Sequence, residues 1–202
     1  MNPHPMRTFL IPAVISLLAA CNTSVAPPGT PPAPPATIPM VQEETLEARQ
    51  ERGRYLVEIM GCNDCHSPKL MGPKGPYPDP DRLLSGHPAA QALPAVPKAA
   101  LKDWALFAMG NTAAVGPWGV SFAGNITSDA TGIGSWSEEQ FANAMRKGWW
   151  KGIEGSRPLL PPMPWPNFAH MPDADISAIY AYLMSTKPVE NVVPAPVPPD
   201  QL

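Results

Sequence analysis

The sequence predicts an all-α fold of about four helices, interrupted by one long loop insertion. Three stretches repeat apolar side chains at the three- and four-residue spacing of an amphipathic helix. No stretch alternates polar and apolar residues over a length that predicts a strand. Thirty prolines and fifteen glycines indicate that much of the remaining chain forms turns and extended loops.

The first residues of the chain indicate a secretory signal. A short region with Arg7 precedes an apolar run from Phe9 to Ala20, and that run is too short to span a membrane as a mature helix. The run ends in LLAAC, which resembles a bacterial lipobox. The resemblance implies a signal peptide over residues 1–20, a lipid on Cys21 and a place on the periplasmic side of the bacterial cell envelope, anchored to membrane. An ordinary cleavage site beside an incidental cysteine is the alternative.

Proline-rich segments flank the part of the chain that is expected to fold. Residues 21–42 show no apolar period and predict a semi-rigid linker between the lipid and the domain. Residues 188–202 are also rich in proline, and we expect them to wrap the surface or to be mobile. The remaining residues, 43–187, have the size of one domain.

The helices of this domain follow from their apolar spacing. The first is expected over residues 43–61 and stops at Gly61, and a weaker one is expected over residues 98–109. The next spans 137–147, where Ser137 and Gln140 form a capping box. The last spans 173–185, with Asp173 as its N-cap. We expect the stretch from 69 to 124 to hold structure of its own, because long structureless insertions are uncommon in compact domains.

The stretch GCNDCHSP carries the chemistry of the sequence. Cys62 and Cys65 are three residues apart and His66 follows directly, which is the C-x-x-C-H pattern of covalent haem attachment. Cysteines at this spacing lie on one face of a helical turn, where both thiols reach one porphyrin while the imidazole reaches the iron. The sequence therefore predicts one covalent haem c, with Cys62 and Cys65 as its attachment sites and His66 as the proximal iron ligand.

Two other interpretations of this pattern are weaker. A redox dithiol usually lies at a helix N-terminus after a strand, where the thiol pKa is lowered, but this pair follows a predicted helix. A structural zinc site needs four ligands. Only His87 and His170 remain in residues 43–187, and neither has a companion at ligand spacing.

The sixth ligand of the iron must come from elsewhere in the chain. Met163 lies in LLPPMPWPNF, where four prolines fix the backbone around it. Such a loop presents a thioether without breaking helical hydrogen bonds, and methionine–histidine ligation suits electron transfer. Met163 is therefore the preferred ligand, followed by Met171 and then by His170 or His87.

With these residues in place, the chain resembles class I monohaem cytochromes c. It is most similar to the modules in the cytochrome c subunits of membrane-bound bacterial alcohol and gluconate-type dehydrogenases. Four segments carry the resemblance: RGRYLVEIMGCNDCHSP, NITSDATGIGSWSEEQFANAMRKG, PPMPWPNF and MPDADISAIYAYLMS. Two features depart from it, since those subunits usually join three modules and residues 69–124 are longer than the corresponding loop.

The resemblance implies a cytochrome c-like fold around one haem, with Met163 as distal ligand. It implies that the first and last helices cross, so that Gly53 lies near Tyr180 and Tyr182. It also implies a loop along the haem edge whose side chains either contact the cofactor or pack the loop. These side chains are Asn125, Ile126, Thr127 and Trp136.

Together these features predict a lipid-anchored electron carrier that is not an enzyme. Its expected partners are redox proteins, either a dehydrogenase or a respiratory complex, and the membrane through the lipid. The chain has 17 acidic and 14 basic side chains, which argues against nucleic acid as a partner. A haem enzyme or gas or redox sensor with a labile sixth ligand is the alternative function. A structural envelope lipoprotein without a cofactor is a third.

Overall fold

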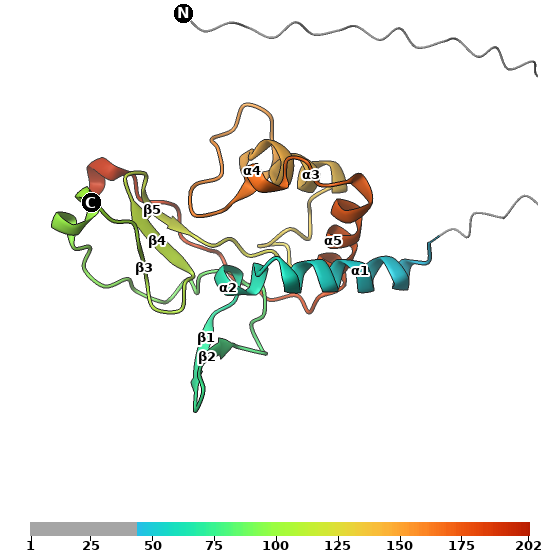
Figure 1. Ribbon diagram of the computed structural model, residues 1–202, viewed down its shortest axis with the longest axis horizontal. Helices are drawn as coiled ribbons and strands as arrows, with labels where there is room; N and C mark the ends of the chain where they lie inside the picture. Colours follow the sequence, from blue (N-terminus) through green and yellow to red (C-terminus); the bar gives the residue numbers. More distant parts are fainter. Residues whose placement is uncertain (1–43) are drawn as a thin grey trace, which may run out of the picture. The chain divides into compact units, whose positions relative to one another are not determined.

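A computed structural model describes residues 44–202 of the chain (Figure 1). The predicted signal, the predicted lipidation site Cys21 and the predicted linker 21–42 lie outside the described residues. Within 44–202 the chain forms five α-helices, which are α1 (Leu46–Ile59), α2 (Cys62–His66), α3 (Glu138–Lys147), α4 (Trp165–Phe168) and α5 (Asp173–Ser185). It also forms five strands, which are β1 (Lys69–Gly72), β2 (Gly75–Pro78), β3 (Leu106–Phe107), β4 (Ala113–Gly116) and β5 (Gly119–Phe122).

The predicted all-α class is therefore wrong. The stretch from 69 to 122 holds a two-stranded sheet, β1-β2, and a three-stranded sheet, β3-β4-β5, and both are antiparallel. Strands of two to four residues are too short to show an alternating pattern, so their pairing decides their structure. The long insertion is thus a pair of small sheets beside the helices.

Both hairpins turn on the same four-residue motif. Gly72-Pro-Lys-Gly75 joins β1 to β2, and Gly116-Pro-Trp-Gly119 joins β4 to β5. In each, the two glycines are cross-strand partners and a two-residue loop separates them. The second glycine adopts a left-handed φ, 110° at Gly75 and 91° at Gly119, which side chains disfavour. Proline and glycine at these turn positions are a hairpin signal that the sequence does carry.

The predicted helix over 98–109 is also wrong. Only Lys98–Lys102 is helical, as a short 3-10 helix, and Leu106 and Phe107 then pair with β4. Trp104 is 67% exposed, so the apolar side chains of this stretch do not form a face that packs on the core. Helical propensity without a packed face does not sustain an isolated helix.

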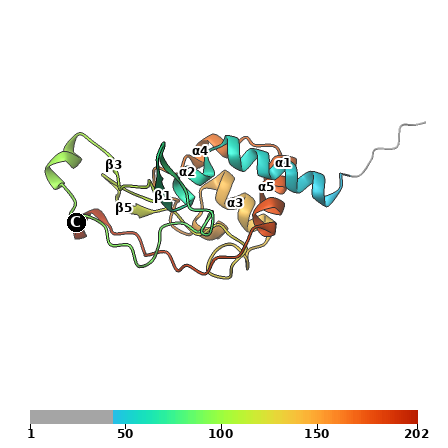
Figure 2. The same cartoon turned by 90° about the horizontal axis from the view of Figure 1, so that it is seen from below.

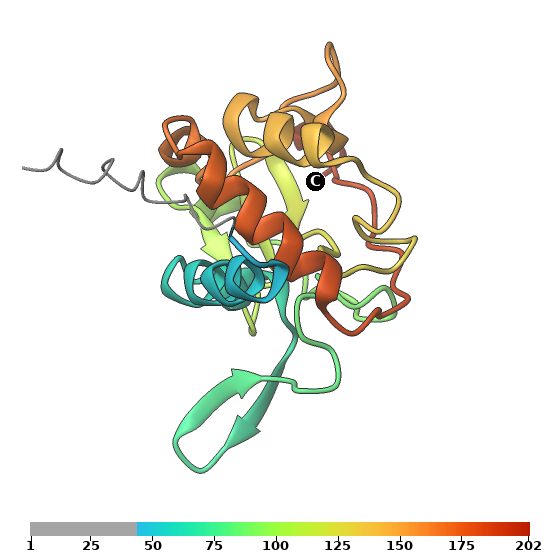
Figure 3. The same cartoon turned by 90° about the vertical axis from the view of Figure 1, so that its right-hand side faces the viewer.

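The first and last helices cross, as Figure 3 shows. Gly53 is buried at the crossing, where an added Cβ would overlap the carbonyl oxygen of Ala178 and lie 2.8 Å from Tyr182 Cβ. The helices meet backbone to backbone at this point. The implied neighbour Tyr182 is confirmed here. The core between the helices is built mainly from aliphatic side chains, including Val57, Leu84, Ile133, Ile176, Ile179 and Leu183.

The boundaries of the later helices match their sequence signals closely. Ser137 and Gln140 form the expected capping box, because the Ser137 hydroxyl accepts the Gln140 amide and the Gln140 side chain accepts the Ser137 amide. The last helix spans residues 173–185 as predicted. Its N-cap, however, is Pro172, so the prediction of Asp173 as the cap is wrong and Asp173 is the first helical residue.

The C-terminal segment runs back along the domain to the three-stranded sheet (Figure 2). Val197 exchanges backbone hydrogen bonds of 2.8 and 3.0 Å with Val120 on the free edge of β5. Asn191 donates its side-chain amide to the carbonyls of Ser85 and His87, at 2.7 and 2.9 Å. The segment is therefore tied to the surface over most of its length. Among the helices of residues 44–202, none combines the length and the apolar character needed to cross a bilayer.

Candidate haem site

The predicted attachment motif occupies the short helix α2. It begins immediately after Gly61, whose left-handed φ of 68° ends α1 and lets a new helical turn start. Cys62 and Cys65 are thus one turn apart on that helix, and no disulfide joins them. Burial raises the pKa of Cys62 to about 11 and also raises the pKa of Cys65. A redox dithiol needs a lowered thiol pKa, so these thiols do not suit that role.

The ring of His66 is oriented by one hydrogen bond. Its Nδ1 lies 2.7 Å from the carbonyl oxygen of Gly124, which can only accept, so Nδ1 carries the proton. Nε2 is then left as the nitrogen with an available lone pair, as a metal ligand requires. Burial lowers the pKa of His66, which favours the neutral imidazole. The structure therefore presents His66 in the tautomer that leaves Nε2 able to bind a metal.

Gly86 packs against the backbone that orients the His66 ring. The amide of Gly86 donates to the carbonyl of His66 at 2.7 Å. Gly86 has a φ of 77°, and an added Cβ would stand 2.5 Å from both Ala123 O and Gly124 C. The backbone of Gly86 therefore packs directly on the segment whose carbonyl orients the His66 ring.

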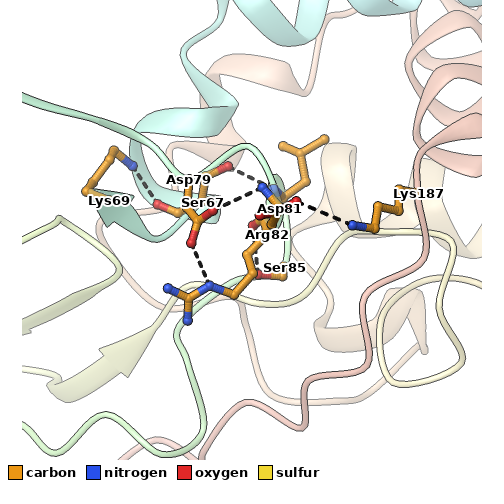
Figure 4. Close-up of polar contacts among 8 residues, drawn as sticks. Ser67, Lys69, Asp79, Asp81, Arg82, Ser85 and Lys187 are labelled. Atoms are coloured by element: carbon orange, nitrogen blue, oxygen red, sulfur yellow. Dashed lines mark hydrogen bonds and ion pairs between the residues drawn. The ribbon is translucent and has the colours of Figure 1, made fainter. Parts of the chain in front are cut away.

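Polar contacts hold the segment after α2, and Figure 4 shows the one between Lys69 and Ser67. The ammonium of Lys69 donates to three carbonyls at the end of α2, those of Asn63, Asp64 and Ser67, at 2.8, 3.1 and 2.6 Å. These carbonyls would otherwise lack partners, because the last turn of a helix leaves its carbonyls unpaired. A lysine at this end also complements the helix dipole. Lys69 therefore stabilises the motif-bearing turn.

Leu84 packs into the core beside this turn in a conformation that bulky residues rarely adopt. Its φ is 60° and its side chain is 1% exposed. The Leu84 amide donates to the Ser67 hydroxyl at 2.8 Å, and its carbonyl accepts the Ile126 amide at 2.9 Å. These two bonds hold Leu84 between the segment after His66 and the predicted haem-edge loop.

Predicted site residues from three distant parts of the chain pack against one apolar cluster. Cys62, Ile126, Trp136 and Met163 are each partly buried and pack against the core cluster that contains Leu84 and Ile133. About a hundred residues separate Cys62 from Met163 in sequence. The fold therefore brings the motif, the predicted loop and the proline-flanked methionine to a shared apolar environment.

Asn125 and Thr127 serve the loop itself. The Asn125 side chain accepts from the amide and hydroxyl of Thr127 and donates to Thr131 and to the Val189 carbonyl. Thr127 is fully buried. Their polar groups are thus satisfied within the protein, so the packing alternative describes these two residues best.

The other candidates for the sixth ligand differ in their surroundings. His87 is fully buried, and both ring nitrogens are engaged, Nδ1 with Thr112 Oγ1 at 2.9 Å and Nε2 with Gln91 O at 3.1 Å. It is therefore a structural histidine of the insertion. His170 is exposed, whereas Met171 packs against the core cluster and stays an alternative to Met163. In residues 44–202, no three His, Cys, Asp or Glu side chains gather as a metal-binding group.

Sequence reasoning missed Gly86, Gly124 and Lys69. Their contributions are backbone contacts or a cap on backbone carbonyls, and such contacts leave no residue pattern. The only sequence signal is the recurrence of glycine in SGHP and FAGN, which indicates turns but not which carbonyl they expose.

Comparison with known proteins adds an independent observation. No family model matches the chain. The chain is 45% identical over 80 residues to one of the subunits of nicotinate dehydrogenase from Pseudomonas putida, which covers 39% of this chain and 6% of that protein. It is 30% identical over 146 residues to the gluconate 2-dehydrogenase cytochrome c subunit of Pantoea cypripedii, covering 72% of this chain and 25% of that protein.

A third relative is the cytochrome c subunit of the quinone alcohol dehydrogenase of Gluconobacter oxydans. The two are 32% identical over 149 residues, which cover 73% of this chain and 23% of that relative. The matches thus span a quarter or less of the length of each of these three relatives. The chain is similar to cytochrome c subunits of bacterial dehydrogenases, which agrees with the resemblance expected from its motifs.

Proposed function

We propose that this protein is an electron-transfer c-type cytochrome that carries one haem c and is not itself an enzyme. Cys62 and Cys65 would form the thioether bonds, His66 would bind the iron through Nε2, and Met163 would be the distal ligand. When bound, the haem supplies one-electron chemistry by cycling its iron between the ferric and ferrous states. The protein holds the two axial ligands and surrounds the site with apolar side chains.

One observation carries this proposal. Cys62, Ile126, Trp136 and Met163 pack on one apolar cluster, while the hydrogen bond from His66 to Gly124 leaves the other ring nitrogen available. An apolar environment and a fixed histidine tautomer are what the protein must provide for a haem with two axial ligands. The similarity to cytochrome c subunits supports the same function from a separate source.

The cellular setting follows from the N-terminal sequence and the relatives. We infer that residues 1–20 are a lipoprotein signal peptide and that Cys21 is lipidated, so that the linker 21–42 tethers the cytochrome to the periplasmic side of a membrane. A tether raises the effective concentration of the carrier near membrane-bound partners. The relatives are named as parts of dehydrogenases, and a dehydrogenase or a respiratory complex is therefore the proposed redox partner.

The test is the axial ligand set of the purified, haem-loaded protein. Covalent haem should survive denaturing electrophoresis in the natural protein and should be lost when both Cys62 and Cys65 are replaced by alanine. Met163→Ala should abolish the methionine–iron charge-transfer band of the ferric protein. The matched control is Met109→Ala, because Met109 is 84% exposed and should leave the band unchanged. A band that survives Met163→Ala would refute the ligand assignment, and Met171→Ala would then be tested.

Carbon monoxide separates an electron carrier from a haem enzyme or gas sensor. A ferrous haem with both axial positions filled by protein should bind carbon monoxide slowly or not at all. Rapid binding to the natural protein would favour the enzyme or sensor. A protein without covalent haem would instead be a structural lipoprotein.

A further inference from the structure

The strand β5 is fixed along both of its edges. On one edge it pairs with β4, with Ala114 opposite Ser121. On the other edge Val120 exchanges two backbone hydrogen bonds with Val197 of the C-terminal segment. An added Cβ at Gly119 would overlap the Val197 carbonyl, so the chain passes closely here. A strand paired on both sides is a rigid platform for the side chains it presents.

Ser121 extends a hydroxyl from this strand to the loop that holds Met163. Its Oγ donates to the carbonyl of Pro161 at 2.5 Å and accepts the indole Nε1–H of Trp118 at 3.2 Å. Ser121 is 7% exposed, so little water competes for these bonds. The hydroxyl has two carbonyl acceptors within reach, Pro161 at 2.5 Å and Ala114 at 3.5 Å, so its single proton goes to Pro161. The N–H that Trp118 donates to Oγ limits the other orientations of the hydroxyl.

The methionine loop has few other hydrogen bonds to hold it. Pro161, Pro162 and Pro164 have no amide proton to donate. Within the loop, the Met163 amide reaches the Leu160 carbonyl at 3.3 Å, which is long for such a bond. The remaining bonds of residues 160–164 are local, such as the one that the Asn167 amide donates to the Pro164 carbonyl. In the described part of the chain, the bond from Ser121 is the one that reaches these residues from a distant element.

We propose that Ser121 is a positioning residue for the distal ligand, acting through the Pro161 carbonyl two residues before Met163. This inference rests on the proposed function of Met163 and assigns a role to the insertion, whose three-stranded sheet braces the ligand loop. Because proline restricts the chain between Pro161 and Met163, holding the Pro161 carbonyl also limits where the thioether can move. The hydrogen bond from Ser121 to Pro161 would therefore keep the Met163 thioether at the distal position.

The experiment measures how readily an added ligand displaces the methionine. Imidazole is titrated into the ferric, haem-loaded full-length protein, and its binding is followed by visible spectroscopy. Loss of one net hydrogen bond in Ser121→Ala should raise the apparent imidazole affinity about three- to tenfold. Ser121→Thr keeps the hydroxyl and should bind imidazole like the natural protein. The matched control is Ser156→Ala, which removes a hydroxyl bonded to the Trp150 carbonyl at 2.9 Å in the preceding loop and should change nothing.

A second variant tests the same contact if Ser121→Ala does not fold. Trp118→Phe keeps the serine but removes the indole N–H that limits the other orientations of its hydroxyl, and it should raise imidazole affinity about twofold to threefold. Imidazole affinities in Ser121→Ala or in Trp118→Phe that equal that of Ser156→Ala would overturn the inference. If Met163→Ala itself leaves the charge-transfer band in place, the ligand assignment fails. If that band disappears while Ser121→Ala has no effect, only the role of Ser121 is refuted.

Discussion

Gly53 on α1 and Ala178 on α5 meet backbone to backbone, with no room for a side chain between them. A Cβ on Gly53 would overlap the Ala178 carbonyl oxygen, which cannot move away without distorting α5. Helix interiors normally disfavour glycine relative to alanine. At this position the relation is reversed, because the close approach of the two helices needs the smaller residue.

Gly53→Ala should therefore destabilise the protein by about 1–3 kcal/mol, since overpacking forces the helices apart. The measurement is the free energy of unfolding from denaturant titration. Glu47→Ala on the exposed face of α1 is the control and should change stability by less than about 0.5 kcal/mol. A stability gain in Gly53→Ala, as helix propensity alone predicts, would show that the crossing is looser than described.

Gly86→Ala should disturb the carbonyl that orients His66. The new Cβ would press on Ala123 and Gly124, so the Nδ1 hydrogen bond should weaken and the haem reduction potential should rise, because a less basic ligand stabilises ferric iron less. We expect a stability loss of about 1–2 kcal/mol from the left-handed φ and about 1–3 kcal/mol more from the contact.

A matched glycine separates these two effects. Gly155 has a φ of 76°, close to the 77° of Gly86, but an added Cβ there would meet nothing within 4 Å. Gly155→Ala should show the smaller stability loss and an unchanged reduction potential, measured by redox titration. Equal behaviour of the two variants would mean that Gly86 does not support the His66 ring.

Lys69→Gln should loosen the end of α2. Three backbone carbonyls lose their shared ammonium donor, and the amide of glutamine is shorter and has fewer protons to offer. A loss of about 1–3 kcal/mol is expected in the free energy of unfolding. Lys74→Gln, at the exposed tip of the β1-β2 hairpin, should be neutral and controls for the lost charge. Similar losses in both variants would argue for a general charge effect.

Asp79→Asn should change how stability depends on pH. The hydrogen bond from Arg82 at 2.8 Å, helped by the Asp81 amide, lowers the pKa of Asp79 below its ordinary value of 3.8. A carboxyl with a lowered folded-state pKa stabilises the fold above its unfolded-state pKa and loses that contribution as the pH falls. The stability difference between the natural protein and Asp79→Asn should be constant from about pH 5 to 7 and shrink below about pH 4.

Denaturant midpoints measured across this pH range check the prediction. Asp81→Asn is the control, because the Asp81 side chain is 88% exposed and lies 3.7 Å from Lys187, a distance at which surface pairs contribute little. A stability difference for Asp79→Asn that persists unchanged at low pH would assign its effect to hydrogen bonding of the neutral side chain.

Two helices were predictable from their sequences. Residues 137–147 carry an apolar face and a capping box, whereas residues 173–185 carry the apolar face alone, because their N-cap is Pro172 and not Asp173. The stretch 98–109 has the spacing alone, and tertiary pairing of Leu106 and Phe107 with β4 overrides it. The strands escaped prediction because their glycines and prolines are poor strand formers, and only the repeated turn motif marks them.

The attachment motif and Met163 could be identified as candidates from residue type and spacing. What the sequence could not show is their support. The His66 ring depends on a backbone carbonyl at Gly124, and the methionine loop depends on a hydroxyl from a strand that was expected to be a loop. Every residue carries the same backbone groups, so the sequence does not reveal which carbonyl will accept a given side chain. Only the folded chain brings the two partners together.

The two G-P-x-G turns differ in whether a label could be attached there without disturbing the fold. The tip at Pro73 and Lys74 leads into Gly75, around which an added Cβ would meet nothing within 4 Å, so a peptide tag or dye inserted there would project into solvent. The second turn, at Pro117 and Trp118, leads into Gly119, which packs against the C-terminal segment at Val197, and Trp118 also donates to Ser121. A label at the first turn would therefore report on encounters without disturbing the fold, whereas the second turn should be left intact.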